Sequence, residues 1–190
     1  MTMTTDELDI LHTHINQSTR FLEFGAGAST LYAASVPGIK QIDSVESSEN
    51  YINENLKHHP VISDALSAGK LLFHVIDIGK TSLWGYPTGF FKRHQWPNYS
   101  LSIFSRKSDH DLVLIDGRFR VACTLNCILN TPDNCKIIIH DFWNRPDYHI
   151  VLPFLETKAK ADTLGVFAKK EAIDRHKVKS LIEKYQYKPW

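Results

Sequence analysis

Two glycines and a carboxylate further along the chain have the types and spacing of a nucleotide-binding site. Gly25 and Gly27 follow a short apolar segment, and Glu46 stands about 20 residues beyond them. Glycine lets the backbone approach a ligand closely, and a helix that starts after such a turn offers free N–H groups to an anion. A carboxylate at this distance can accept hydrogen bonds from a ribose diol. The spacing predicts that the turn holds a nucleotide-like ligand.

A histidine and two aspartates have the chemistry to move protons. Asp116 and Asp141 each end a strongly apolar run, and His140 stands beside Asp141. An imidazole next to a carboxylate can titrate near neutral pH, so His140 is a candidate general base. The alternative is a packed histidine that bonds a backbone carbonyl group. Both interpretations stay open.

The segment 81–107 is a further candidate, because it is long, aromatic and rich in glycine and proline. Long segments of this kind are usually functional or disordered, and the aromatic content argues against disorder. We predict an ordered loop or lid. Trp84 and Tyr86 with Arg93 and His94 would suit a flat or sugar-like ligand that carries a negative group. The alternative is a packing cluster or a contact between two copies of the chain.

Two arginines follow the same apolar run as Asp116, namely Arg118 and Arg120. Either guanidinium could anchor an acidic group of a ligand. Equally, Arg118 could form a structural ion pair with Asp116 or Asp141. We expect at least one of the two arginines to have the structural role.

Apolar runs alternate with helical patterns along the chain, and this alternation predicts the fold class. The predicted strands are 20–24, 41–45, 71–76, 111–116, 136–141, 157–161 and 164–168. The predicted helices are one that follows a capping box of Thr4 and Glu7, then 28–34, 48–56, 119–129, 147–155 and 173–185. Most of the strands are continuous apolar runs, which indicates a doubly wound α/β fold with a mostly parallel sheet covered on both faces. Ligands of such sheets lie beyond the carboxyl ends of the strands.

Composition narrows the class of protein. The chain has 190 residues, a formal net charge of +1 and 43% hydrophobic residues, which fits one folded domain over 1–190. No basic run favours nucleic acid as a partner, and no apolar run approaches the roughly 20 residues that span a bilayer. The N-terminus has no apolar signal segment, and the three cysteines lack zinc-like spacing. We expect a cytoplasmic protein with reduced thiols.

Four segments in order, "LEFGAGAST", "VESSENY", "DLVLIDGRFR" and "IIIHDF", resemble class I S-adenosylmethionine-dependent methyltransferases. Within that superfamily the chain is most similar to small bacterial members with an "IDGRFR" signature, which are distantly similar to catechol- and macrolide-type O-methyltransferases. The resemblance covers nearly the whole chain. It implies a seven-stranded sheet with an antiparallel last strand, S-adenosylmethionine as cofactor and S-adenosylhomocysteine as product.

The resemblance also implies which residues contact the cofactor. The matching positions are Glu23, Gly25, Gly27, Ser29, Thr30, Glu46, Ser47, Asp77, Ile78 and Asp116. Glu23 and the glycines would line the methionine and ribose side, and Ser29 and Thr30 would reach the methionine carboxylate, partly through backbone N–H groups. Glu46, with Ser47 beside it, would bind the ribose. The Asp77–Ile78 pair would contact adenine, and Asp116 would lie under the methionine amine or near the acceptor.

Two departures from the catechol-type enzymes bear on a metal ion. Those enzymes hold a magnesium-like ion with carboxylates at the positions of Asp116 and Asp141 and with an amide side chain. Here the amide position is Phe142, and Phe119 replaces the catalytic lysine. We therefore do not expect a divalent metal ion to be bound between these residues.

The predicted function is methyl transfer from S-adenosylmethionine to a small acceptor, with oxygen as the expected target atom. Asp116, His140 and Asp141 are the candidate catalytic residues, and Trp84, Tyr86, Arg93 and Arg118 the candidate acceptor-binding residues. An NAD-dependent oxidoreductase is the first alternative, disfavoured because Thr30 stands where its fingerprint requires a third glycine. A cofactor-binding module without catalysis is the second. A homodimer through the aromatic segment stays open.

Overall fold

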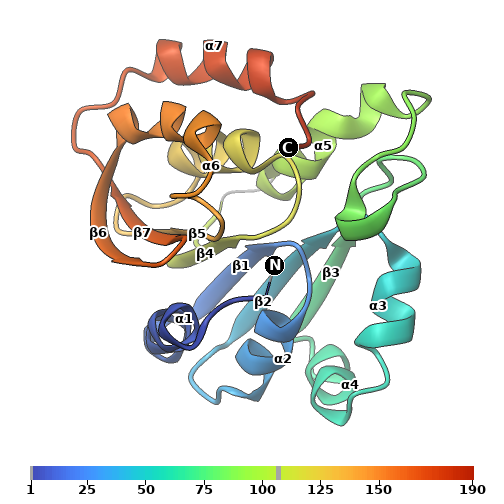
Figure 1. Ribbon diagram of the computed structural model, residues 1–190. Coiled ribbons are helices and arrows are strands. Elements are labelled where there is room, and N and C mark those ends of the chain that lie inside the picture. Colours follow the sequence, from blue (N-terminus) through green and yellow to red (C-terminus); the bar gives the residue numbers. More distant parts are fainter. Residues whose placement is uncertain (1, 106–107) are drawn as a thin grey trace.

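The computed structural model describes residues 2–105 and 108–190, so the last two residues of the predicted loop, 106 and 107, lie outside the described part. Seven strands form one sheet in the order β3-β2-β1-β4-β5-β7-β6 (Figure 1). The strands are β1 (Arg20–Phe24), β2 (Gln41–Glu46), β3 (Leu71–Val75), β4 (Leu112–Ile115), β5 (Lys136–Ile139), β6 (Leu155–Ala161) and β7 (Leu164–Lys169).

Strand directions follow the predicted fold class. The first five strands pair in parallel, and β7 pairs antiparallel with both β5 and β6. The turn between β6 and β7 contains Asp162, whose positive φ of 41° reverses the chain tightly. The predicted doubly wound, mostly parallel seven-stranded sheet with an antiparallel C-terminal strand is confirmed.

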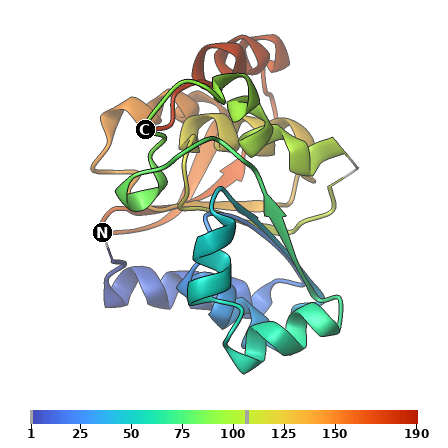
Figure 2. The ribbon, with the colours of Figure 1, turned by 90° about the vertical axis from the view of Figure 1, so that its right-hand side faces the viewer.

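Helices cover both faces of the sheet (Figures 1 and 2). Helices α1 (Thr5–Gln17), α2 (Ala28–Ser35) and α4 (Pro60–Ser67) pack on one face through a core that includes Leu11, Ala33 and Ile62. Helices α5 (Trp96–Leu101), α6 (Arg120–Asn130) and α7 (Arg175–Tyr185) pack on the other face. The short α3 (Glu49–Asn55) follows β2. Every residue of β4 is buried, as a strand between two helical layers requires.

Three local predictions differ from the structure. Helix α4 was not predicted, although Pro60 at its first position is a common helix start. Residues Pro146–Phe154 form a 3-10 segment, η4, where an α-helix was expected, because Pro153 inside it cannot donate a backbone hydrogen bond. The predicted loop 81–107 contains α5 and short 3-10 segments, and its Trp96 and Tyr99 belong to the core.

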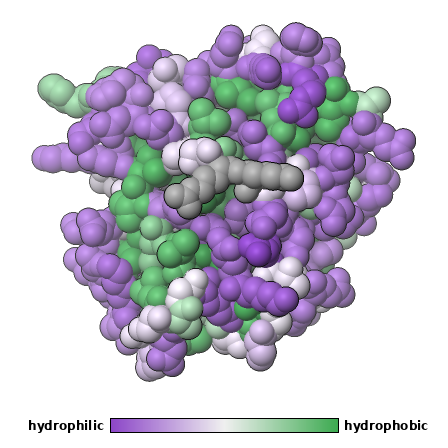
Figure 3. Space-filling model, turned by 180° about the vertical axis from the view of Figure 1, so that it is seen from behind, coloured by the Kyte–Doolittle hydropathy of each residue, from purple (hydrophilic) through white to green (hydrophobic). Residues whose placement is uncertain are grey.

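The surface is mixed in character. Figure 3 shows a mostly hydrophilic back face on which apolar side chains gather in separate areas. Leu72 and Val75 of the edge strand β3 are among the exposed apolar side chains, together with Trp84, Phe90 and Phe91 of the aromatic segment. Among the described residues, no helix has the length and apolar character that a membrane crossing needs.

Candidate functional site

The glycine turn lies at the switch point of the sheet, where the strand order reverses between β1 and β4. Gly25 has a φ of 98°, and a Cβ placed there would lie 2.7 Å from the Cα of Gly117, in the loop after β4. The two loops are therefore in backbone contact, and any side chain at Gly25 would separate them. Above Gly27 there is more room, since the nearest atom to a Cβ there is the Tyr51 hydroxyl at 3.8 Å.

Glu46 joins the end of β2 to the glycine turn. One carboxylate oxygen accepts a hydrogen bond from the Ala26 N–H at 3.2 Å. The other accepts from the N–H groups of Ser47 at 2.6 Å and Ser48 at 3.0 Å, and from the Ser47 hydroxyl at 3.0 Å. A carboxylate with these backbone partners is held rigidly at the strand ends. Glu46 and Ser47 thus lie beside the turn that contains Ala26 and Gly27.

Glu23 lies beneath the glycine turn and is fully buried. Its carboxyl group accepts hydrogen bonds from the hydroxyls of Ser29 at 2.6 Å, Ser44 at 2.7 Å and Thr30. Burial raises the pKa of Glu23 to about 7, although the three hydroxyls act in the opposite direction. The expectation that Glu23, Ser29 and Thr30 present side chains to a ligand is corrected here, because these side chains satisfy one another. The part of Ser29 and Thr30 that remains available to a ligand is their backbone, at the start of α2.

The two residues expected at an adenine ring follow β3. The Ile78 side chain is buried in the core, and its carbonyl oxygen accepts from the Trp96 indole N–H at 2.9 Å. Asp77 is exposed, accepts from the Gly79 N–H at 2.9 Å and pairs with Lys92. The loop after β3 is thereby connected to the aromatic segment.

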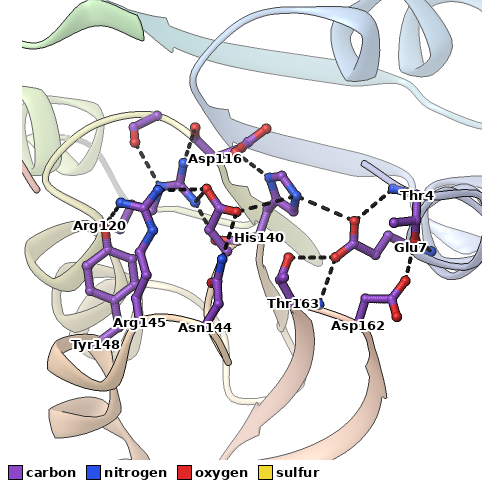
Figure 4. Close-up of polar contacts among 12 residues, drawn as sticks. Thr4, Glu7, Asp116, Arg120, His140, Asn144, Arg145, Tyr148, Asp162 and Thr163 are labelled. Carbon is purple, nitrogen blue, oxygen red and sulfur yellow. Dashed lines mark hydrogen bonds and ion pairs between the residues drawn. The ribbon is translucent and has the colours of Figure 1, made fainter. Parts of the chain in front are cut away.

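His140 lies at the end of β5 between two carboxylates (Figure 4). Its Nδ1 is 2.8 Å from Asp116 Oδ1, and its Nε2 is 3.5 Å from Glu7 Oε2. Burial alone would lower the pKa of His140, but the hydrogen bond to Asp116 and the charges of Asp116 and Asp141 raise it. The ring nitrogens of His140 thus face carboxylates and not a backbone carbonyl group.

Glu7 reaches this cluster from the first helix. It completes the predicted capping box with Thr4, and its other carboxylate oxygen accepts from the Thr163 N–H at 2.9 Å and the Thr163 hydroxyl at 2.6 Å. Burial would raise the pKa of Glu7, but the Thr163 and Thr4 hydrogen bonds and the charge of His140 lower it. The sequence analysis assigned Glu7 only to helix capping, since no local pattern relates it to residue 140.

Arg120 holds the two aspartates at the strand ends (Figure 4). Its guanidinium nitrogens lie 3.1 Å from Asp116 Oδ1 and 3.5 Å from Asp141 Oδ2. Asp141 also pairs with Arg145 at 3.0 Å. The arginine with the structural ion pair is therefore Arg120 and not Arg118, and its guanidinium takes the space between the carboxylates that a shared metal ion would need.

The two aspartates differ in access. The Asp116 side chain is 33% exposed, whereas that of Asp141 is 4% exposed and enclosed by its arginine partners. The charges of Arg120, His140 and Arg145 outweigh burial and lower the pKa of Asp141. Of the three predicted catalytic side chains, Asp116 is the one that a bound molecule can reach.

The four predicted acceptor-binding residues fall into separate groups. Arg118 lies over the Tyr86 ring, with its Cζ 4.1 Å from the ring centroid. Arg93 lies over Tyr187 of the C-terminal tail, 4.4 Å from that centroid. Trp84 points outward and is exposed. The structure therefore brings Tyr86 and Arg118 together and leaves Arg93 and Trp84 apart from them.

No protein-family model matches the chain, and neither does any curated protein. A solved methyltransferase-like protein from Silicibacter pomeroyi is 28% identical, and the match covers 100% of this chain and 97% of that one with a TM-score of 0.84. An RNA methyltransferase from Salinibacter ruber, solved in complex with S-adenosyl-L-homocysteine, is 14% identical, with 91% and 96% of the two chains covered and a TM-score of 0.54.

A third structure is the N-methyltransferase NodS from Bradyrhizobium japonicum, which is 12% identical, with 86% of this chain and 97% of that one covered and a TM-score of 0.51. The fold of this chain is that of the class I S-adenosylmethionine-dependent methyltransferase superfamily, as the sequence resemblance predicted. The printed names of two of these structures, an RNA methyltransferase and an N-methyltransferase, differ in the acceptor, and what the chain shares with both is the fold.

Proposed function

We propose that the protein is an S-adenosylmethionine-dependent methyltransferase that acts on a small acceptor, with oxygen as the target atom. The observation that carries the proposal is the contact between Glu46 and the glycine turn at the switch point of the sheet. A ribose diol needs a fixed carboxylate next to a turn that a ligand can approach closely, and Glu46 beside Gly27 supplies both.

The residues present fit an adenosyl cofactor. Glu46 would accept hydrogen bonds from the ribose, and the backbone N–H groups at the start of α2, which Gly27 leaves without a side-chain cap, would receive the carboxylate of the methionine part. The loop that contains Asp77 and Ile78 would form the adenine end. When bound, the cofactor supplies a methyl group on a positively charged sulfur.

Asp116 would act on the acceptor. Its exposed carboxylate would accept the proton of the acceptor hydroxyl as the oxygen–methyl bond forms and the sulfur–methyl bond breaks, with the bonding electron pair left on sulfur. His140 and Arg120 both contact Asp116 Oδ1 and would hold the carboxylate in place. Precise placement of the two reactants accounts for much of the catalysis of such a displacement.

Calorimetric titration with S-adenosylhomocysteine tests the cofactor half of the proposal. The wild-type protein should bind it saturably and should not bind NAD. Replacing Glu46 by alanine should weaken binding by about 1–3 kcal/mol, because the ribose hydroxyls of the bound ligand lose their hydrogen-bond acceptor. The matched control is Glu54→Ala, an exposed carboxylate on the neighbouring α3, which should bind like the wild type.

Either of two results would contradict the proposal: no binding of S-adenosylhomocysteine by the wild type, or equal affinity in the Glu46 and Glu54 variants. Methyl transfer to a small hydroxyl compound, followed with labelled cofactor, would then test the reaction itself. A protein that binds the cofactor and transfers to no acceptor would support the binding-module alternative.

A further inference from the structure

Arg118 is a buried cation with an unsatisfied donor. The residue is 7% exposed, and its Nη1 has no hydrogen-bond partner within the described residues. No carboxylate of the described part forms an ion pair with it, whereas Arg120, two residues on, contacts both Asp116 and Asp141. Burying a charged group without a partner is unfavourable by several kcal/mol, so a position of this kind is costly unless something else binds there.

The surroundings of Arg118 are shaped around its guanidinium. The Tyr86 ring lies against it, and a Cβ on Gly85 would lie 3.9 Å from Arg118 Cγ and 3.7 Å from Ser47 Oγ. The 85–86 segment thus covers the arginine and meets the end of β2. Gly85 has a φ of 74°, which favours glycine and lets the backbone turn over Arg118.

Arg145 approaches the same tyrosine from the end of β5. Burial would raise the pKa of Tyr86, but hydrogen bonding to Arg145 and the charge of Arg118 lower it. Tyr86 therefore lies between two cations from two strand ends. Only Arg145 has a carboxylate partner, Asp141. Arg118 is therefore the guanidinium beside Tyr86 that forms no ion pair within the described residues.

We propose that Arg118 binds an oxyanion, a carboxylate or phosphate group, of the acceptor molecule, with Tyr86 beneath the guanidinium and Arg145 at its side. Guanidinium groups match the planar geometry of carboxylates and bind phosphates in the same manner. Under the proposed function Asp116 acts on the acceptor, and Arg118 lies in the same loop after β4, whereas the methionine carboxylate would lie at the start of α2. This assignment to the acceptor rests on the proposed function. The methionine carboxylate of the cofactor has the same chemistry and is distinguished by the experiment.

The first measurement is the binding of benzoate and of inorganic phosphate to the whole protein, by calorimetry and thermal shift, with and without S-adenosylhomocysteine. Wild type should bind at least one of the two anions. Replacing Arg118 by glutamine should weaken that binding at least tenfold. The Arg118→Lys variant should recover part of it for phosphate. The matched control is Arg175→Gln on the exposed side of α7, which should bind as the wild type does.

Folding of the variants provides an independent readout. Because the charge of Arg118 has no ion-pair partner among the described residues, Arg118→Met should unfold at the same or a higher temperature than the wild type when no anion is present. A large loss of stability in Arg118→Met would assign a purely structural role and overturn the proposal.

The source of the oxyanion is decided by a second pair of ligands. S-adenosylhomocysteine carries the amino-acid carboxylate, and 5′-methylthioadenosine lacks it. Equal affinity of wild type and Arg118→Gln for both compounds, together with benzoate or phosphate binding that depends on Arg118, assigns the site to the acceptor. A selective tenfold loss for S-adenosylhomocysteine would assign it to the cofactor and overturn the acceptor assignment.

Failure of this proposal and failure of the proposed function are distinguishable. If anion binding depends on Arg118 but the protein does not bind S-adenosylhomocysteine, the oxyanion site is supported and the proposed methyltransferase function is contradicted. Absence of benzoate and phosphate binding, with an unchanged affinity for S-adenosylhomocysteine in Arg118→Gln, would remove the oxyanion site alone.

Discussion

At the scale of single residues, Glu23 is a carboxyl group whose protonation is linked to folding. Its pKa is ordinarily 4.5 and is raised to about 7 by burial in the folded protein. Between these two values the folded state keeps a proton that the unfolded chain has lost. This contribution to stability is present at low pH and is lost as the pH rises toward about 7.

Replacing Glu23 by glutamine should therefore reduce the fall in the free energy of unfolding between about pH 5 and pH 8. Glutamine keeps the shape and an acceptor oxygen for Ser44 and Thr30, which share Oε1 of Glu23, and it does not titrate. Urea unfolding at several pH values measures the slope, with Glu54→Gln as the exposed control. A variant at Glu23 that keeps the full wild-type decline would show that this carboxyl group is not the cause.

At the scale of elements, Glu7 connects three pieces of the fold. It caps α1, receives two hydrogen bonds from Thr163 in the β6–β7 turn, and lies beside His140 at the end of β5 (Figure 4). A capping residue ordinarily stabilises its own helix by about 1 kcal/mol. The loss of Glu7 should cost more than a cap, because it also removes the carboxylate beside Nε2 of the buried His140 and the acceptor of the Thr163 N–H and hydroxyl groups.

We expect Glu7→Ala to lower the free energy of unfolding by about 2–4 kcal/mol, from the lost cap together with the buried donors left unpaired. Chemical denaturation measures the change. Asp9→Ala, an exposed carboxylate on the same helix, should have an effect within about 0.5 kcal/mol. Similar losses in the two variants would mean that the connection to Thr163 and His140 contributes little.

At the scale of the whole molecule, the C-terminal tail contacts the loop after β4 and the 93–95 segment. Tyr187 lies beneath Arg93, and the Pro189 carbonyl oxygen accepts from the Phe119 N–H at 3.3 Å. Trp190 lines a cavity of about 120 Å³ at the start of α6. The last residues of the chain thereby support the loop after β4, which carries Arg118.

Deleting residues 187–190 should speed hydrogen exchange at the Phe119 amide and in the 93–95 segment, while exchange in the central strands stays slow. Hydrogen-exchange mass spectrometry resolves these regions. Phe91→Ser is the control, since Phe91 is 100% exposed and its replacement should change neither region. Unchanged exchange at Phe119 in the truncated protein would contradict a supporting role for the tail.

The sequence alone indicated the seven strands, their order along the chain and most of the helices. The strand 20–24 agrees with β1 residue for residue, and the glycine turn, the capping box and the position of Glu46 at a strand end all follow from local pattern. These features depend on neighbours in the chain, where hydrophobic periodicity and backbone preferences operate. The sequence analysis did not predict helix α4 or the 3-10 form of 146–154, because the local sequence pattern of each segment was ambiguous.

Only the tertiary structure decided which polar groups meet. Arg118 and Arg120 are almost identical in sequence context, yet one holds two aspartates and the other is left with an unpaired nitrogen. Glu7 meets His140 and Thr163 although each is far from it along the chain. The physical reason is that ion pairs and buried hydrogen bonds are set by distances of a few ångströms between different strand ends, and those distances exist only once the sheet has closed the long separations in sequence.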